Sequence, residues 1–338
     1  MKIGIVGCGG ISNAHAKDLR TLIDKGEDIE VTYLADVAEE KALELKKKWG
    51  FTGARIVSDY KKMISLVDAA IICTPHTLHY EQAKAFLSEG KHVLVEKPMV
   101  CKIEHAVDLI ETAEENGVVL EIAFQRHFIP TFVAARNFVR EGSLGEVKMI
   151  ALILAQDWYN LARRSWRGTK ALGGGGELVD SGSHISDVAF WVSGLKPYEV
   201  FAFFDDYDIE VDVNTCLVAK LNNGALLSYG IAGDDPDWLD YEIFWGTEGR
   251  LLLHGNRVFF EDKSKCKVEL DTSNIEPSRP VFNFIDTILG RSGNEVPPIY
   301  GLYVAALSEA AYESMVERRP ITIKELCEAR GINYSKYF

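Results

Sequence analysis

The sequence predicts an α/β protein of two domains, and three observations lead to that fold class. The 338 residues are about twice the length of an average domain. Residues 1–124 alternate short apolar runs with helical segments of 10–15 residues, which is typical of a parallel sheet covered on both faces. Residues 125–338 contain short strands joined by tight turns, which predicts an α+β domain with an open, mostly antiparallel sheet.

In the first domain we expect strands at 3–6, 31–35, 69–73, 93–95 and 118–124, with helices at 13–25, 39–49, 80–88 and 103–116. Ligands of such sheets bind outside the carboxyl ends of the strands. The residues that directly follow each strand are therefore the first candidates for a binding site.

The glycine-rich turn after the first strand predicts a dinucleotide site. Gly7, Gly9, Gly10 and Ile11 follow that strand and open a helix, although Ser12 stands at the third position of the G-x-G-x-x-G pattern. A glycine at the first position permits the tight turn, and one at the second lets the backbone approach a pyrophosphate at the helix N-terminus. The alternative is a turn that needs glycine for steric reasons alone.

The ends of the next strands extend this expected cofactor site. Asp36 can accept hydrogen bonds from ribose hydroxyls and repels a 2′-phosphate, so NAD is favoured over NADP. Its alternative role is to cap the following helix. Thr74, Pro75, His76 and His79 are expected beside the cofactor, with the two histidines at a helix start or in the wall. No carboxylate or cysteine completes a metal site with them.

In the second domain we expect strands at 147–154, 200–204, 213–221, 225–231, 241–245, 250–253 and 258–261, with helices at 131–140, 177–192 and 302–317. Hairpin turns are expected at 222–224 and 246–249. Trp238, Tyr241 and Trp245 are expected on the sheet, where they would be buried between subunits of a homo-oligomer.

The composition excludes several classes of protein. The chain is 47% hydrophobic and 26% charged, as ordinary globular proteins are. Its formal net charge of −13 argues against a nucleic-acid partner. No apolar run reaches the ~18 residues that span a bilayer, and we expect no signal peptide and no membrane association. The six cysteines never form C-x-x-C, so we expect a cytoplasmic protein without a structural zinc site.

Three segments together resemble the Gfo/Idh/MocA oxidoreductase family, which includes glucose–fructose oxidoreductase and inositol dehydrogenase. The first is the glycine turn at 7–10. The second is Gly90–Pro98, with its Glu-Lys-Pro ending. The third is Gly173–His184, a glycine run followed by Asp-x-Gly-x-His. The resemblance implies an N-terminal Rossmann domain that binds a nicotinamide dinucleotide, and a C-terminal sheet that often forms the subunit interface. The sequence departs from the pattern at Ser12 and at His76, where many members have Asn.

The catalytic candidates are Lys97, Asp180 and His184. Asp180 and His184 are four residues apart in a segment with helical periodicity, which predicts one shared helix face and a carboxylate beside the imidazole. The glycine run before them indicates a backbone that approaches a ligand or bends. Lys97 follows a strand at the carboxyl edge of the sheet, where a cation can stabilise a developing alkoxide. The resemblance implies an active-site role for Lys97, and Lys97–Pro98 is a candidate cis bond.

The expected reaction is the reversible oxidation of a secondary alcohol on a sugar, cyclitol or related polyol, with His184 as general acid/base. Glu96 and Lys97 complete the expected cofactor contacts. Expected substrate contacts, besides the three catalytic candidates, are Gln125, Arg126, Trp158, Trp166 and Arg167. Two alternatives remain: a cofactor-binding sensor without catalysis, and a dihydrodiol dehydrogenase or biliverdin-type reductase. An intact set of catalytic candidates favours an enzyme over a sensor.

Overall fold

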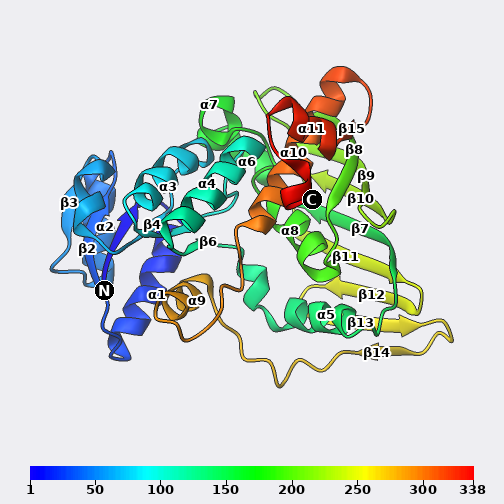
Figure 1. Cartoon of the computed structure of the whole chain (residues 1–338), viewed down its shortest axis with the longest axis horizontal. Helices are drawn as coiled ribbons and strands as arrows, with labels where there is room; N and C mark the ends of the chain where they lie inside the picture. Colours follow the sequence, from blue (N-terminus) through cyan, green and yellow to red (C-terminus); the bar gives the residue numbers. More distant parts are fainter. The chain divides into compact units, whose positions relative to one another are not determined.

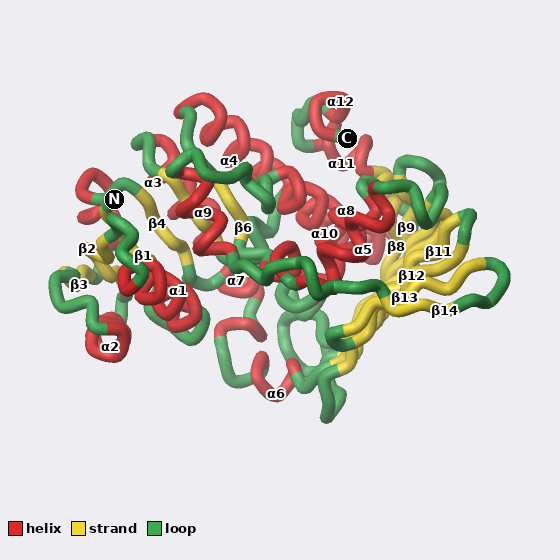
Figure 2. The backbone as a smooth tube through the Cα atoms, turned by 90° about the horizontal axis from the view of Figure 1, so that it is seen from below, coloured by secondary structure: helices red, strands yellow, loops and turns green.

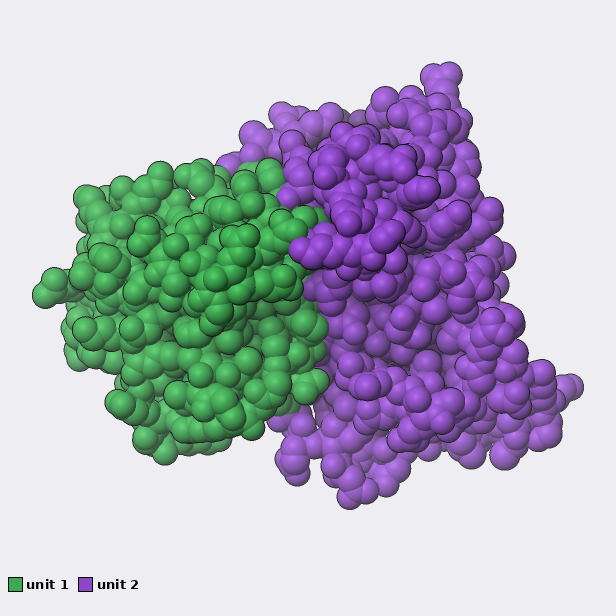
Figure 3. Space-filling view, in the orientation of Figure 1, with its two compact units in different colours: residues 1–100, 105–124, 278–298 green, residues 101–104, 125–277, 299–338 purple.

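The computed structural model describes all 338 residues, which form two compact units coloured separately in Figure 3. Unit 1 contains residues 1–100, 105–124 and 278–298, and unit 2 contains the rest. The boundary predicted at residues 124/125 coincides with a change of unit. The assignment of residues 278–298 to the second domain differs from the structure, because that segment returns to unit 1. No helix in the chain is both long enough and apolar enough to cross a membrane.

Unit 1 is built on a six-stranded parallel sheet in the order β3-β2-β1-β4-β5-β6, as in Figure 1. Its strands are β1 Lys2–Val6, β2 Glu30–Ala35, β3 Arg55–Val57, β4 Ala69–Ile72, β5 His92–Val95 and β6 Leu120–Ile122. This is the doubly wound order in which the strand sequence reverses between β1 and β4, and dinucleotides bind at that reversal. The predicted α/β class is confirmed.

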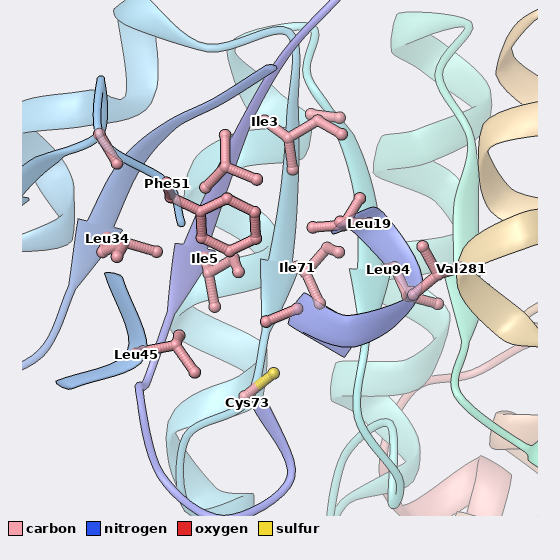
Figure 4. Packing of buried hydrophobic residues seen from close by; sticks show 14 of the residues in the cluster. Ile3, Ile5, Leu19, Leu34, Leu45, Phe51, Ile71, Cys73, Leu94 and Val281 are labelled. Atoms are coloured by element: carbon pink, nitrogen blue, oxygen red, sulfur yellow. The ribbon is translucent and has the colours of Figure 1, made fainter. Parts of the chain in front are cut away.

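Helices cover both faces of this sheet. They are α1 Ser12–Asp24, α2 Glu39–Trp49, α3 His79–Ser88, α4 Ile103–Asn116 and α9 Pro280–Ile288, with 3-10 turns η1 Tyr60–Leu66 and η2 His76–Leu78. Figure 4 shows the core between the sheet and one helical layer, where Ile3, Ile5 and Leu19 are fully buried. The strands are apolar on both sides because helices cover both of their faces.

Helix α9 explains why the predicted domain boundary missed part of unit 1. Val281 of α9 points toward Leu94 of β5 (Figure 4), and Phe284 and Ile285 belong to the same buried cluster. The apolar stripe of α9 therefore completes one face of the parallel sheet. The sequence of α9 shows that one side of the helix is apolar, but it does not show which of the two sheets that side covers.

Unit 2 contains a nine-stranded sheet in the order β14-β13-β12-β11-β7-β10-β9-β8-β15. Its strands are β7 Val147–Ala155, β8 Pro197–Asp205, β9 Asn214–Leu221, β10 Leu226–Ala232, β11 Leu239–Gly246, β12 Gly249–His254, β13 Arg257–Asp262, β14 Lys267–Glu269 and β15 Ile321–Thr322. All neighbours are antiparallel except β7 and β10. The two predicted hairpins are confirmed as β9–β10 and β11–β12.

One face of this sheet is covered by helices, among them α5, α8 and α10 (Figure 2). The helices of unit 2 are α5 Pro130–Arg140, α6 Trp158–Ala162, α7 Lys170–Gly173, α8 Gly182–Ser193, α10 Ile299–Glu317, α11 Ile323–Ala329 and α12 Tyr334–Tyr337, with 3-10 turns η3 Gln125–Phe128 and η4 Trp166–Gly168. The other face leaves large apolar side chains exposed: Met149, Ile153, Phe203, Val218 and Leu226.

A buried acid lies in the core of unit 1. Glu121 of β6 is fully buried, and neither carboxyl oxygen has a hydrogen-bond partner. It pairs in register with Leu94 of β5. Burial, together with the nearby charge of Glu295, raises the pKa of Glu121 to about 9. Glu121 is therefore protonated at neutral pH.

We predict that Glu121→Met stabilises the protein more at pH 8 than at pH 5. In the folded state the raised pKa makes Glu121 hold a proton that the unfolded chain has lost. Wild-type stability therefore falls between about pH 4.5 and 9, by up to about 1.4 kcal/mol per pH unit from this group. Calorimetric melting at both pH values measures the difference, with the exposed Glu89→Met as control. An equal gain in melting temperature at both pH values would contradict the raised pKa.

Candidate active site

The turn between β1 and α1 requires glycine at its first position. Gly7 has φ +86°, and a Cβ there would lie 2.8 Å from the backbone carbon and oxygen of Cys73, just beyond β4. Its N–H donates to the carbonyl of Ala35 at the end of β2 (2.8 Å). Gly7 thus joins the ends of three neighbouring strands, so the steric explanation of this glycine applies at Gly7.

The next two glycines are different, because they border open space. A Cβ at Gly9 or Gly10 would meet no atom within 4 Å. No side chain caps the N-terminus of α1, and the buried Ser12 donates from its Oγ to the carbonyl of Gly9 (2.7 Å). An open loop at an uncapped helix N-terminus suits a pyrophosphate. Ser12 at the third glycine position supports this loop and does not obstruct it.

Asp36, directly after β2, accepts two backbone hydrogen bonds. Its Oδ2 accepts from Cys8 N (2.7 Å) and its Oδ1 from Ala38 N (2.9 Å). Each carboxylate oxygen has a second lone pair for another donor, such as a ribose hydroxyl. Val37 beside it is 92% exposed, so no basic side chain follows Asp36 to attract a 2′-phosphate.

The residues after β4 form a buried support. Thr74 Oγ1 donates to Gln82 Oε1 (2.6 Å), and His76 is 4% exposed in η2. The fully buried His79 lies with Nδ1 2.8 Å from Pro98 O and Nε2 2.8 Å from Thr74 O. Burial lowers its pKa to about 4. His79 therefore connects the loops after β4 and β5.

The Glu-Lys-Pro segment after β5 contains a buried glutamate that pairs with a histidine of α1. Glu96 Oε1 lies 2.6 Å from Nε2 of His15 in α1, and both side chains are buried. Burial alone would raise the pKa of Glu96, but the hydrogen bond and charge of His15, with the charge of Lys97, outweigh it and lower the pKa. Glu96 thus fixes the backbone before the half-buried Lys97, whose bond to Pro98 is cis as predicted.

In unit 2 the structure corrects one element of the expected catalytic segment. The prediction of a helix over 177–192, with Asp180 and His184 on one helical face, is wrong in its first turn. Helix α8 begins at Gly182, and Asp180 lies in the preceding turn. The N–H of Asp180 donates to the carbonyl of Gly176 (3.0 Å). Asp180 and His184 are four residues apart in the sequence. Because the helix starts only after Asp180, they do not share one helical face.

Two of the expected substrate residues converge on Asp180. Its Oδ2 accepts from Nε1 of Trp158 (2.9 Å) and from Nε of Arg167 (2.7 Å). Asp180 and Trp158 are buried, while Arg167 is partly exposed and lies over the ring of Trp166 at 4.4 Å. The partly exposed His184 follows in the first turn of α8. The fold therefore places the guanidinium of Arg167 and the indole of Trp158 on the carboxylate of Asp180. The indole of Trp166 lies against that guanidinium.

The two expected substrate residues of η3 have different surroundings. Gln125 is exposed, whereas Arg126 is 6% exposed and pairs with Asp240 (2.8 Å) and Glu242 of β11. These ion pairs use the guanidinium of Arg126 to hold η3 on the sheet. Burial raises the pKa of Glu242 to about 7, although the charge of Arg126 opposes that shift.

Sequence reasoning missed a group of buried polar residues behind Asp180. Asp212, 4% exposed, binds the backbone of the turn, and Glu177 accepts from Nε2 of Gln156 (2.9 Å). Burial, with the charges of Asp212 and Asp180, raises the pKa of Glu177 to about 8 against the effect of Gln156. The one available signal was an acid between Val211 and Val213. No cluster that could hold a metal ion occurs in the chain.

Comparison with known proteins identifies a family match over both units. Residues 1–124 match the family described as "Oxidoreductase family, NAD-binding Rossmann fold", and residues 132–252 match the "GFO/IDH/MocA C-terminal domain". Myo-inositol 2-dehydrogenase of Thermotoga maritima is 25% identical and is aligned over 96% of this chain and 99% of its own length. The scyllo-inositol 2-dehydrogenase (NADP(+)) of Bacillus subtilis is 28% identical over 96% of both chains.

A solved structure supports the fold. Levoglucosan dehydrogenase in complex with NADH superposes with a TM-score of 0.85 at 20% identity, over 96% of this chain and 98% of that protein. The combined α/β and mixed-sheet architecture of this chain is therefore shared with a protein that holds NADH.

We predict that replacing Asp36 by Ser together with Val37 by Arg shifts cofactor preference from NADH toward NADPH. The change removes a charge that repels the 2′-phosphate and adds one that attracts it, so the ratio of the two dissociation constants should move by roughly tenfold or more. Fluorescence titration with both reduced cofactors measures the ratio. Asp36→Asn, which keeps an acceptor oxygen but loses the charge, should lie between wild type and the double variant. A wild-type protein that binds NADPH more tightly than NADH would refute the role of Asp36.

Proposed function

Because this chain belongs to the GFO/IDH/MocA family of oxidoreductases, we propose that it is an NAD-dependent dehydrogenase of a secondary alcohol on a cyclitol, sugar or related polyol. The observation that supports this proposal most is the convergence of Trp158 and Arg167 on Asp180, in the turn directly before the helix that carries His184. The relatives named above act on inositols, and the structural neighbour is a levoglucosan dehydrogenase.

The cofactor half of the proposal uses the ends of the parallel strands. We expect the open loop at Gly9, Gly10 and Ile11 to hold the pyrophosphate, with Gly7 shaping the turn, and Asp36 to accept the ribose hydroxyls. Thr74, Pro75, His76 and Glu96 form the wall and its support, with His79 behind them. The nicotinamide, when bound, supplies the hydride acceptor.

The catalytic half assigns each of three side chains one task. His184 takes the proton of the substrate hydroxyl as general base. Lys97 donates a hydrogen bond to the same oxygen and stabilises its developing negative charge. Asp180 accepts hydrogen bonds from Trp158 and Arg167, and it orients substrate or His184.

The substrate contacts that we propose are two partly exposed groups near Asp180 and one exposed amide of η3. Trp166 offers a flat face, Arg167 retains donors beyond its bond to Asp180, and the exposed Gln125 offers an amide. These groups suit an oxygen-rich ring. Arg126 is not included, because its guanidinium is buried with two carboxylates.

We further propose that two copies of the chain associate through the open face of the unit 2 sheet. The register aligns a row across seven strands that is apolar except at Ser228: Phe201, Val218, Ser228, Ala151, Ile243, Leu252 and Phe259. Exposed apolar patches of this kind mark interaction sites, and an identical face on a second copy would cover it. All six cysteines are free, which supports a location in the reducing cytoplasm.

We predict that Lys97→Ala and His184→Gln each lower kcat by about 10²-fold or more and leave NADH affinity unchanged, because both groups act on charge that develops during the reaction. The measurement is reduced-nicotinamide absorbance with myo-inositol, scyllo-inositol, levoglucosan and glucose, beside fluorescence titration with NADH. Lys102→Ala, which removes an exposed lysine nearby in sequence, is the control. NADH binding without oxidation of any polyol would favour a sensor, and normal turnover in either variant would remove that residue from the mechanism.

We predict that Ile153→Lys with Val218→Lys makes the protein monomeric, because two buried charges per copy cannot be desolvated in the interface. Light scattering after gel filtration measures the mass of both proteins. Leu161→Lys, which changes an equally exposed leucine of α6, should leave the mass unchanged. A wild-type protein that is monomeric at all concentrations tested would contradict the proposed interface.

A further inference from the structure

In the turn before α8, residues 176–181, three successive backbone N–H groups donate to one residue outside the turn. The N–H of Gly176 donates to Oδ1 of Asp212 (2.8 Å), and the N–H of Leu178 donates to Oδ2 (2.9 Å). The N–H of Glu177, between them, donates to the backbone carbonyl of Asp212 (2.9 Å). Three successive backbone donors of the turn thus end on a single buried residue.

The remaining acceptor sites of the Asp212 carboxylate are also filled. Its Oδ1 accepts from the hydroxyl of Tyr312 in α10 (2.6 Å), and its Oδ2 accepts from Oγ1 of Thr215 in β9 (3.2 Å). An ionised carboxylate offers about four lone-pair sites, and all four are used. Asp212 therefore links the turn to a helix and to the sheet of unit 2.

Close packing leaves the turn no room to shift relative to Asp212. A Cβ at Gly176 would lie 1.9 Å from the carbonyl oxygen of Asp212, and a Cβ at Gly175 would lie 2.5 Å from the hydroxyl of Tyr312. These two positions of the glycine run therefore serve contact with residue 212 and its partner. Contacts within the protein therefore require that these two positions carry no side chain.

The same short segment supports Asp180 by a second route. Val211 and Val213, on either side of Asp212, pack in one buried cluster with Trp158 and Ala162 of α6. Trp158 is the residue whose Nε1 donates to Asp180 (2.9 Å). The segment 211–213 thus holds both the backbone of the turn and one of the donors that orient its carboxylate.

We propose that Asp212 is a positioning residue of the reaction, which sets the place of Asp180 and of the start of α8 without touching substrate or cofactor. The proposal rests on the proposed function of Asp180 and His184. Its physical basis is that the carboxylate of Asp180, two residues beyond the last anchored backbone N–H, can move freely only if the hydrogen bonds to Asp212 break.

Asp212→Asn tests the proposal directly, because asparagine has the same shape as aspartate but accepts fewer hydrogen bonds. An amide has one acceptor oxygen and one NH₂ group, so its nitrogen must face either Gly176 N or Leu178 N. The NH₂ group and a backbone N–H then face each other in the protein interior with no acceptor between them, so the turn must move to separate them. Tyr312→Phe is the matched control, since it removes the hydroxyl that donates to Asp212 and accepts from Gly176 N (3.2 Å), but leaves both backbone hydrogen bonds to Asp212 in place.

We expect Asp212→Asn to lower kcat by about 10²-fold on the polyol of the panel that is oxidised fastest. NADH affinity should stay at the wild-type value, since the cofactor contacts lie in unit 1. Tyr312→Phe should change kcat much less than Asp212→Asn. Wild-type turnover in Asp212→Asn would overturn the proposal.

A double-variant cycle separates positioning from general loss of stability. If Asp212 acts through Asp180, then Asp212→Asn combined with Asp180→Asn should be about as slow as Asp180→Asn alone. Multiplied rate losses would show independent damage and would overturn the proposal. If Asp180→Asn keeps full activity, the proposed role of Asp180 is wrong and the positioning role falls with it. A slow Asp180→Asn beside a fast Asp212→Asn refutes the positioning role alone.

Hydrogen–deuterium exchange gives a readout that needs no turnover. Amides of peptides spanning 174–184 should exchange faster in Asp212→Asn, while peptides of unit 1 should keep their wild-type rates. Unchanged exchange in this turn would overturn the proposal. This measurement decides whether Asp212 holds the turn even if no polyol of the panel is oxidised.

Discussion

Both halves of the candidate site depend on one constraint, which is backbone packed against backbone with no space for a Cβ. At Gly7 the constraint lies between the ends of β1 and β4, and at Gly176 it lies between the turn before α8 and Asp212. The first contact leaves the following loop open at the N-terminus of α1. The second contact bends the chain so that Asp180 precedes α8. A methyl group at either position would separate the elements whose ends form the site.

The protein also contains buried acids, and the pKa of each depends on the hydrogen-bond partners and charges around it. Glu96 has His15 as partner, and its pKa is lowered. Glu177 has one hydrogen bond from Gln156 and two neighbouring acids, and its pKa is raised to about 8. Glu121, away from the site, has no hydrogen-bond partner at all. Ionisation is thus favoured at Glu96, where the hydrogen bond and the positive charges outweigh burial, and opposed at Glu177 and Glu121, where burial and neighbouring acids prevail.

The local pattern predicted five of the six parallel strands, but not β3, and it predicted the glycine turn, the acidic residue after β2 and both hairpins of the second sheet. These features depend on residues that are close in sequence, so spacing and composition carry them. Helix α11 had such a signal too, because Thr322 is an N-cap whose hydroxyl accepts from the N–H of Glu325 and donates to its carboxylate, and sequence reasoning overlooked it. The helix over 177–192 was wrong because a helical spacing of apolar residues cannot show that the first turn is held by Asp212.

The sequence by itself determined the α/β class, the cofactor turn and the set of chemistry-bearing residues, because glycines, apolar periods and strand ends act over short distances. Only the tertiary structure decided which of those residues meet. It paired Arg126 with two acids of β11 and placed Trp158 and Arg167 on Asp180. It returned α9 to the first sheet and placed β7 parallel to β10. Each of these contacts joins segments that are distant in the chain, and their geometry depends on close packing that no local pattern encodes.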